Sequence, residues 1–386
     1  MGLLIGLALA SENDPTMQSG ARSEITRVLR ERVAVEVAAS RARVGDRRRA
    51  AVAALANVAV LWGSTIWLIF GAGNWIAESA SLVVCGLAVA HSIMRVHGYL
   101  HRREWSRVWL WDAMVRTLHP FLLRDWWRAK HHDSHHGATN VEGLDDDLAT
   151  SRLVRVAPSA RWRRWHRFQH RYVFLLAPFL LPAMAAKSSW YAVTGRVGDL
   201  ARTERPTHRA TMVMLVDQWW HVGLVAVMAL LRHSAIDVAG TFVVVMAIAG
   251  TVLLVVFSVQ HTTQITTFPP AWGQISSREE QIIWALRGTA NVATGSRVLS
   301  AFTAHLNHHV EHHLFPSIES RHLPAVRRAV RSVCADFNLV YLEFPTYRAA
   351  IRSWLKYLRA MGRAPEAVPV AAKMAADAIS PFLVST

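Results

Sequence analysis

The chain has 386 residues, is 52% hydrophobic and carries a formal net charge of +16 at pH 7. Its two cysteines exclude a disulfide-rich secreted scaffold and a four-cysteine zinc site, and its hydrophobic content excludes a disordered basic protein. The positive charge fits either nucleic-acid binding or the cytoplasmic face of a membrane protein. Histidine is the unusual component, because 20 such residues require a structural or chemical explanation.

Residues 1–49 form an N-terminal extension ahead of the first apolar run. Within it, residues 21–49 mix aliphatic side chains and charges at helical spacing, which predicts an amphipathic helix on a membrane surface or an ordinary surface helix. At the other end of the chain, residues 363–386 are rich in alanine and proline, and we expect a flexible tail there.

Four apolar runs approach or exceed the roughly 20 residues that span a bilayer. They cover residues 51–70, 75–94, 211–231 and 236–258. Residues 172–186 are also apolar but are fewer and include Pro178 and Pro182, so we expect an interfacial or buried helix there rather than a fifth span. The sequence thus predicts an all-α integral membrane protein with four transmembrane helices in two hairpins.

Charge placement predicts the orientation of these spans. Arginines cluster before the first and third runs and after the second and fourth, whereas Arg232 is the only formal cation in the two short loops between paired runs. The positive-inside rule therefore places both termini and both long loops in the cytoplasm, and basic residues that follow membrane topology disfavour nucleic-acid binding. Only four basic residues are lysine, a bias typical of GC-rich bacterial genomes, so we expect a bacterial inner-membrane protein.

Most histidines lie just outside the predicted spans. They occupy residues 97–101, 131–136 and 305–313, and His261 follows the fourth span. Histidines three or four residues apart share one helix face, and this spacing occurs in the pairs and triplet His97/His101, His131/His135 and His309/His312/His313. Neutral imidazoles suit zinc, iron, copper or nickel. About eight or nine of them exceed the needs of one zinc ion and match two metal ions with open positions.

The remaining histidines are expected to have ordinary roles. A lone histidine at a membrane interface is more often a hydrogen-bonding residue than a ligand, and we assign that role to His91, His119, His208, His221, His233 and His322. His166 and His170 are four residues apart, and we interpret them as a structural pair or as a support for ligands.

The two most specific motifs are residues 126–147, WWRAKHHDSHHGATNVEGLDDD, and residues 306–316, LNHHVEHHLFP. Together with the pair at residues 97 and 101, they resemble the membrane fatty-acid desaturase superfamily, whose signature is three histidine boxes around a cytosolic di-iron centre. The resemblance covers about residues 50–362, which we take as one desaturase domain between the extension and the tail. It implies a cytosolic helical cap that holds the histidine-rich site.

The resemblance implies nine metal ligands and no catalytic side chain beyond them. These are His97, His101, His131, His135, His136, His261, His309, His312 and His313. His132 is an alternative to His131, and His305 and Asn307 are expected to lie next to the ligands. Asp145, Asp147 and Glu311 are expected to orient ligating imidazoles through the far ring nitrogen.

The chain departs from the family pattern at three positions. Gly98 stands where the first box usually has aspartate, His309 stands where front-end members have glutamine, and His308 is an additional candidate ligand. These differences bear on the substrate subclass more than on the metal site.

The activity implied by the resemblance is oxygen-dependent desaturation of a fatty acyl chain, with two non-haem iron ions as cofactor and O2 as co-substrate. The substrate would be an acyl lipid or an acyl chain on a carrier. Because the His-Pro-Gly-Gly motif of a fused b-type cytochrome is missing from the sequence, we expect electrons from a separate ferredoxin or b-type cytochrome with its reductase.

Three other functions compete with desaturation. An acyl-chain or alkyl hydroxylase would use the same scaffold, and sequence motifs discriminate it poorly. A non-enzymatic haem or metal membrane protein would place histidine pairs within its spans, whereas these clusters lie outside them. A zinc intramembrane protease is disfavoured because the sequence contains no His-Glu-x-x-His motif.

Overall fold

The computed structural model describes residues 15–43, 47–71, 73–101, 122–148, 152–198, 200–201, 205–268 and 277–364. His119, residues 1–14 and residues 365–386 of the expected tail lie outside this part of the chain. The described residues are mainly helical, with two pairs of two-residue strands. β1 (Arg196–Val197) pairs antiparallel with β2 (Leu200–Ala201), and β3 (Asn291–Val292) pairs in parallel with β4 (Glu343–Phe344). The predicted helical class is confirmed.

Among the described residues, five helical segments are long and apolar enough to cross a membrane. Four of them contain the predicted spans: α2 (Arg47–Phe70), α3 (Trp75–Leu100), α8 (His208–Leu230) and α9 (Ala235–His261). Their outward side chains are largely aliphatic or aromatic, including Leu55, Val213, Val216, Leu224 and Ile236. Such extensive exposed apolar surface is what a bilayer would cover.

The fifth apolar segment, Arg164–Thr194, contains the interfacial or buried helix expected over residues 172–186. It consists of the short helices η3 (Arg164–Phe168), α6 (Gln169–Tyr172) and η4 (Val173–Leu176), which lead into α7 (Ala177–Thr194). Pro178 falls in the first turn of α7, where a missing N–H is tolerated, and the helix continues through Pro182, which lies inside it. The apolar helical segment, Arg164–Thr194, is therefore longer than the expected residues 172–186.

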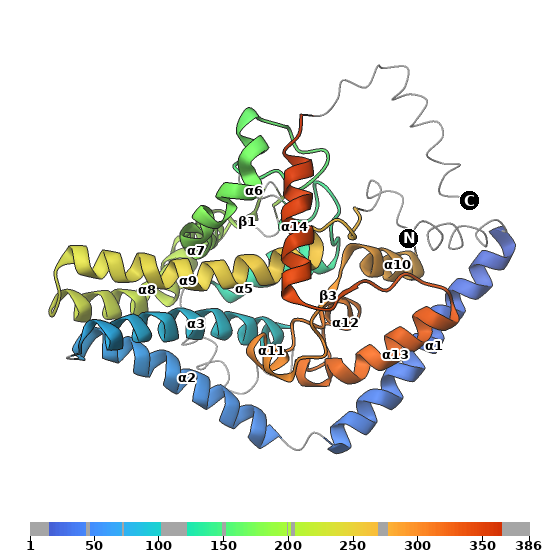
Figure 1. Cartoon of the computed structure of the whole chain (residues 1–386), viewed down its shortest axis with the longest axis horizontal. Helices are drawn as coiled ribbons and strands as arrows, with labels where there is room; N and C mark the ends of the chain where they lie inside the picture. Colours follow the sequence, from blue (N-terminus) through green and yellow to red (C-terminus); the bar gives the residue numbers. More distant parts are fainter. Residues whose placement is uncertain are drawn as a thin grey trace.

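The two hairpins, α2–α3 and α8–α9, lie side by side and turn at the same end of the molecule, at the left of Figure 1. His233 in the second turn donates a 2.9 Å hydrogen bond to the carbonyl oxygen of Ile69 in the first, which joins the turns directly. α3 and α9 pack against each other and α7 packs against α9, around a core that includes Met94, Leu181 and Leu253.

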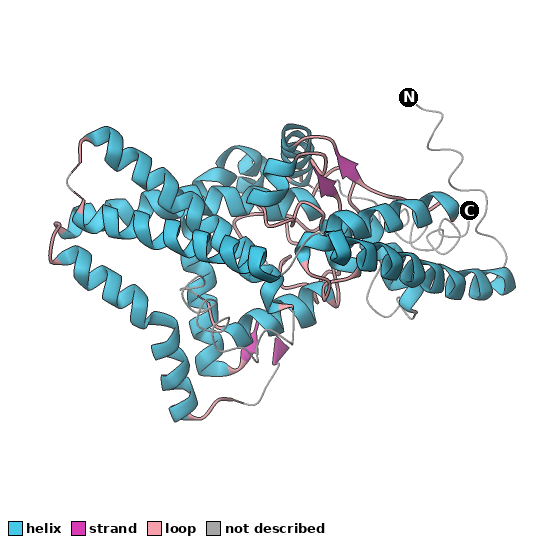
Figure 2. Ribbon diagram, turned by 90° about the horizontal axis from the view of Figure 1, so that it is seen from below, coloured by secondary structure: helices cyan, strands magenta, loops and turns pink. Residues whose placement is uncertain are grey.

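A cap of helices lies at the opposite end, at the right of Figure 1. It contains α1 (Pro15–Arg43), α10 (Arg278–Gly288), α11 (Arg297–Phe302), α12 (His309–Leu314), α13 (Leu323–Asp336) and α14 (Tyr347–Met361). Figure 2 shows how little strand the cap and hairpins contain.

The N-terminal helix α1 uses its apolar face for protein packing. Ile25, Leu29, Val33 and Val37 recur every four residues and are buried in one cluster with side chains of α13 and α12. Arg328 on α13 also forms a 2.7 Å ion pair with Glu36 on α1. The helix therefore braces the region that carries the third histidine box.

Close packing of α7 on α9 depends on a residue without a side chain. A Cβ atom added to Gly250 would lie 1.9 Å from the carbonyl oxygen of Ala177, whereas one added to Gly240 on the same helix meets nothing within 4 Å. We expect Gly250→Ala to destabilise the protein by about 1–3 kcal/mol through overpacking, while Gly240→Ala leaves stability unchanged or slightly higher. Apparent melting temperatures in detergent check this, and equal values for the two variants would contradict the packing.

Candidate metal centre

The histidine-bearing elements meet where the hairpins join the cap. His97 lies in the last turn of α3, His101 directly follows that helix, and His261 is the last residue of α9. The second cluster lies in a π-helical segment, η2 (Arg128–His136), that continues α5 (Arg124–Trp127), and the third lies on α12. Segments far apart in sequence thus deliver imidazoles to one region.

All nine predicted ligands fall into two groups of converging nitrogen atoms, each group spanning at most 4.8 Å. The first group is His97, His101, His131, His136 and His312, hereafter the five-histidine group. The second is His135, His261, His309 and His313, hereafter the four-histidine group. A third combination, His131, His135 and Asp147, reuses members of both.

The π-helical geometry of η2 decides which second-box histidine enters which group. A π-helix closes i→i+5 hydrogen bonds, so residues five apart approach each other. The Nε2 atoms of His131 and His136 accordingly lie 3.1 Å apart in the five-histidine group. His135 belongs to the four-histidine group instead. Their α-helical spacing predicts that His131 and His135 lie together. In the structure they belong to different groups.

The ε nitrogens point inward. His97 Nε2 lies 2.8 Å from His312 Nε2 and 3.0 Å from His131 Nε2, and in the other group His309 Nε2 lies 2.9 Å from His261 Nε2. Ligand nitrogens about 2.0–2.1 Å from one metal ion at right angles would be separated by about 3 Å. The buried nitrogen atoms are therefore spaced as neighbouring ligands of one ion would be.

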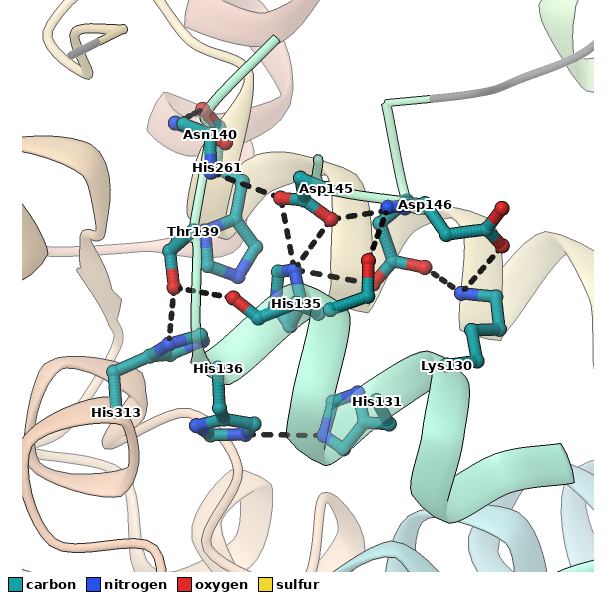
Figure 3. Close-up of polar contacts among 12 residues, drawn as sticks. Lys130, His131, His135, His136, Thr139, Asn140, Asp145, Asp146, His261 and His313 are labelled. Atoms are coloured by element: carbon teal, nitrogen blue, oxygen red, sulfur yellow. Dashed lines mark hydrogen bonds and ion pairs between the residues drawn. The ribbon is translucent and has the colours of Figure 1, made fainter. Parts of the chain in front are cut away.

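Side-chain partners fix two rings of the four-histidine group, as Figure 3 shows. His135 Nδ1 donates to the carboxylate of Asp145, whose nearer oxygen is 3.0 Å away. Thr139 donates its hydroxyl hydrogen to the carbonyl oxygen of His135 and accepts from His313 Nδ1 at 3.1 Å. In both rings the proton is held on Nδ1, which leaves the lone pair of Nε2 for a metal ion.

Backbone carbonyls fix the other two rings of this group. His261 Nδ1 donates to the carbonyl oxygen of Gly288 at 3.3 Å, and His309 Nδ1 donates to that of Leu306 at 3.2 Å. Every ring of the four-histidine group thus has an outer hydrogen-bond partner. In the five-histidine group, by contrast, His97 Nδ1 and His136 Nδ1 have no hydrogen-bond partner among the described residues.

Burial keeps the imidazoles of His131, His136, His309, His312 and His313 neutral at pH 7. Burial, followed by repulsion from neighbouring imidazoles, lowers the pKa of His131, His136, His309 and His313 well below the ordinary value, and lowers the pKa of His312 to about 3. Metal binding requires neutral histidine. The environment therefore selects the protonation state in which a ring can ligate a metal ion.

The other predicted site residues have different surroundings. Asp145 and Asp147 contact His135 as expected, with Asp147 Oδ2 3.3 Å from its Nδ1. Glu311 was expected to orient an imidazole as well. It accepts hydrogen bonds from Asn291 and Tyr341 instead, at 2.8 and 2.7 Å.

Histidines outside the two groups make ordinary contacts. His132 stacks on the ring of His101 with centroids 4.1 Å apart, and His305 and His308 lie outside both groups. Asn307 braces the loop ahead of α12 through a 3.0 Å bond to Ser300. The expected hydrogen-bonding histidines include His91, which contacts Phe302, His233, which contacts Ile69, and His322, which contacts Ser40.

Two residues contact the converging histidines in a way that the sequence-based prediction did not include. Thr139 lies four residues after His135, a spacing that could have indicated its hydrogen bond to that residue. Trp127 stacks on His131 at 4.9 Å and meets the edge of His97 at 5.6 Å between ring centroids. Nothing in the local sequence distinguishes Trp127 from its neighbour Trp126.

A cavity of about 210 Å³ borders the site on the side of the cap. Its wall includes His136 from the five-histidine group and His313 from the four-histidine group, whose rings stack at 4.3 Å. Arg278 and Trp284 of α10 also line it.

The fold and the site define a helical protein with extensive apolar helices and a buried, histidine-rich site fit for two metal ions. Residues 74–345 match the model of the family described as fatty acid desaturase, and the chain belongs to this family. The predicted resemblance is confirmed at that level, and the family places the chain among oxidoreductase enzymes.

The sequence identity to three individual members of known name lies between 25% and 31%. The chain is 31% identical over 246 residues to an sn-1 linoleoyl-lipid 6-desaturase of Synechocystis sp., covering 62% of this chain and 67% of the relative. It is 30% identical over 262 residues to Delta(5) fatty acid desaturase A of Dictyostelium discoideum, covering 64% of this chain and 55% of the relative. An sn-1 linoleoyl-lipid 6-desaturase of Arthrospira platensis is 25% identical over 242 residues, covering 62% of this chain and 65% of the relative. The chain thus spans between 55% and 67% of the length of these three relatives.

Asp145 offers a test of the metal centre that leaves every histidine in place. Removing the partner of a ligating imidazole typically weakens metal binding about 10–100-fold, so Asp145→Asn should lose Fe²⁺ at lower chelator concentration than the wild type. Asp133→Asn is the matched control, since Asp133 is an exposed residue of η2, the helix that carries His135. Iron retained after dialysis against graded chelator measures the effect, and identical curves for the two variants would refute the role of Asp145.

Proposed function

We propose that the chain is an oxygen-dependent acyl-chain desaturase in which the two histidine groups hold two iron ions. The observation that carries this proposal is the convergence of nine largely buried imidazoles into separate groups of five and four. The donor set fits iron, because imidazole nitrogen suits this metal, and nine nitrogens exceed the needs of a single zinc ion. Membership of the desaturase family supports the same assignment.

The reaction removes two hydrogens from an acyl chain and reduces O2 to two molecules of water, with two electrons from a donor and two protons. The bound iron would supply the activation of O2. The protein holds each ε-nitrogen lone pair toward the metal positions, through Asp145 and Thr139 in the four-histidine group. Trp127 packs on two ligand rings and restricts their rotation.

The proposed substrate is the acyl chain of a membrane lipid. Relatives named for linoleoyl-lipid desaturation support this class, and His97 and His261 lie at the ends of two apolar helices, where an acyl tail can approach from the bilayer. An acyl chain on a carrier is the alternative source, and it would reach the same ligands from the aqueous side.

We propose four membrane spans, with the segment that ends in α7 forming a buried or interfacial helix rather than a fifth span. Both ends of this segment form hydrogen bonds with elements at the end of the molecule where the cap lies. At its start, Gln169 donates a 2.8 Å bond to the carbonyl oxygen of Leu358 on α14, and near its end Ala192 accepts a 2.9 Å bond from Thr211 near the start of α8. A segment that begins and ends on one side does not cross the bilayer. The charge distribution favours the cytoplasm of a bacterial inner membrane for that side.

The proposed electron donor is a separate ferredoxin or b-type cytochrome with its reductase. The cavity walled by His136 and His313 lies on the aqueous side and reaches one ring of each group. The net charge of +16 favours an acidic partner.

Substitution of one ligand from each group tests the metal assignment. His135→Ala and His312→Ala should each abolish turnover and lower bound iron, since an imidazole donor is lost, while the protein still inserts into the membrane. His208→Ala at the exposed start of α8 is the control and should keep iron and activity. His131→Ala should lose iron whereas His132→Ala should retain it. Wild-type iron content in the His135 or His312 variant would refute the assignment.

Product mass separates desaturation from the competing hydroxylation. In a host with defined lipids, we expect products lighter than the substrate by two hydrogens, and mass spectrometry with location of the new double bond measures this. Gain of one oxygen atom with the acyl chain still saturated would instead identify a hydroxylase on the same scaffold. An inactive His135→Ala sample from the same host provides the baseline.

A further inference from the structure

Asn140 occupies an unusual position directly after the second histidine box. Its side chain is 0% exposed, and its backbone adopts a φ of 58°, in the left-handed region. Residues other than glycine adopt this conformation at a cost of roughly 1–2 kcal/mol, and asparagine and aspartate tolerate it best. Glycine would fit the backbone without strain, so the asparagine side chain itself must contribute something.

The amide of Asn140 connects its own loop to the end of α9 with the residues that follow it, and to the end of α10. Its Nδ2 atom lies 3.1 Å from the carbonyl oxygen of His261, 3.2 Å from that of Thr267 and 3.1 Å from that of Gly288. An amide nitrogen carries two hydrogens, so three acceptors share two donors. In addition, the backbone N–H of Asn140 donates a 2.8 Å bond to Asp145.

These bonds connect the supports of two ligands. The Gly288 carbonyl oxygen that accepts from Asn140 also accepts from His261 Nδ1, and the Asp145 carboxylate that accepts from the Asn140 N–H also accepts from His135 Nδ1. The rings of His135 and His261 meet edge to face with centroids 4.8 Å apart. A shift of Asn140 would therefore displace the outer partners of both rings together.

We propose that Asn140 is a positioning residue that sets the geometry of the four-histidine group before a metal ion binds, with no comparable influence on the five-histidine group. The inference rests on the proposed function only in the identity of the metal as iron. Its structural part, the coupling of the loop after η2 to the end of α9 and to the end of α10, holds for the metal-free protein as well.

Two substitutions isolate the amide. Asn140→Gly keeps the left-handed backbone and the N–H bond to Asp145 but removes the amide, and Asn140→Asp keeps the shape but removes both donor hydrogens. The matched control is Asn338→Gly, because Asn338 also has a positive φ, of 51°, but lies after α13, away from the metal ligands.

The first measurement is iron per chain together with Mössbauer spectra. We expect Asn140→Gly and Asn140→Asp to fall from about two iron ions to about one, with loss of the spectral component that His261→Ala also loses and retention of the other. Combining Asn140→Gly with His261→Ala should cause no further loss. Unchanged iron and spectra in either Asn140 variant would overturn the proposal, as would equal loss of both components, which indicates general unfolding.

The second measurement uses metal-free protein and is independent of iron. Hydrogen–deuterium exchange of residues 260–268 and 287–291 should accelerate about tenfold in Asn140→Gly, because local opening becomes easier, and should match wild type in Asn338→Gly. Unchanged exchange would overturn the proposal. If wild-type protein contains no iron but the exchange result holds, the iron assignment fails while the positioning role stands.

Discussion

The structure depends on the burial of many imidazoles at one place. Nine histidines meet between the hairpins and the cap, and four pairs of their ε nitrogens approach to between 2.8 and 3.1 Å. A buried polar atom left without a partner costs about 1–3 kcal/mol, and protonation of neighbouring rings would add repulsion between like charges. Shared cations remove both problems at once, because each lone pair then has an electrophile. The arrangement is therefore coherent as a metal centre and unfavourable as a simple hydrophobic core.

The larger architecture follows from the need to deliver these rings. α3 and α9 carry His97 and His261 at their ends on the side of the cap, so their packing against each other fixes the distance between one ligand of each group. α7 supports α9 through the close contact at Gly250, and α1 braces α13 beside the third box. A defect in helix packing far from the histidines would thus be transmitted to the site, since the ligands have no independent scaffold.

The sequence predicted which histidines come together better than how they are arranged. Histidine boxes and the position after the last span pointed to all nine rings that the structure brings together, since crowded histidines repel one another when protonated and such crowding is costly without a metal ion. The division into groups was not predictable from α-helical spacing, because the π-helical turn sends His131 and His136 to one group and His135 to the other. The Asn140 amide was missed for a different reason, as its three carbonyl partners lie 121, 127 and 148 residues away. The prolines likewise led to too short a helix being predicted at α7, because Pro178 lies where a helix can begin and the helix continues through Pro182.

The two groups differ in how their geometry is maintained. Each ring of the four-histidine group donates from Nδ1 to a fixed acceptor, so its tautomer and orientation are determined before any ion binds. The five-histidine group relies more on ring packing, with Trp127 against His97 and His131 and with the outer nitrogens of His97 and His136 unpartnered among the described residues. A preorganised ligand set holds an ion in one geometry, whereas rings held by packing can reorient as ligands enter or leave. If the proposed reaction with O2 takes place here, such an unequal pair would combine one fixed ligand set with one that can adapt. The rings that could adapt are those that Trp127 and the end of α3 enclose.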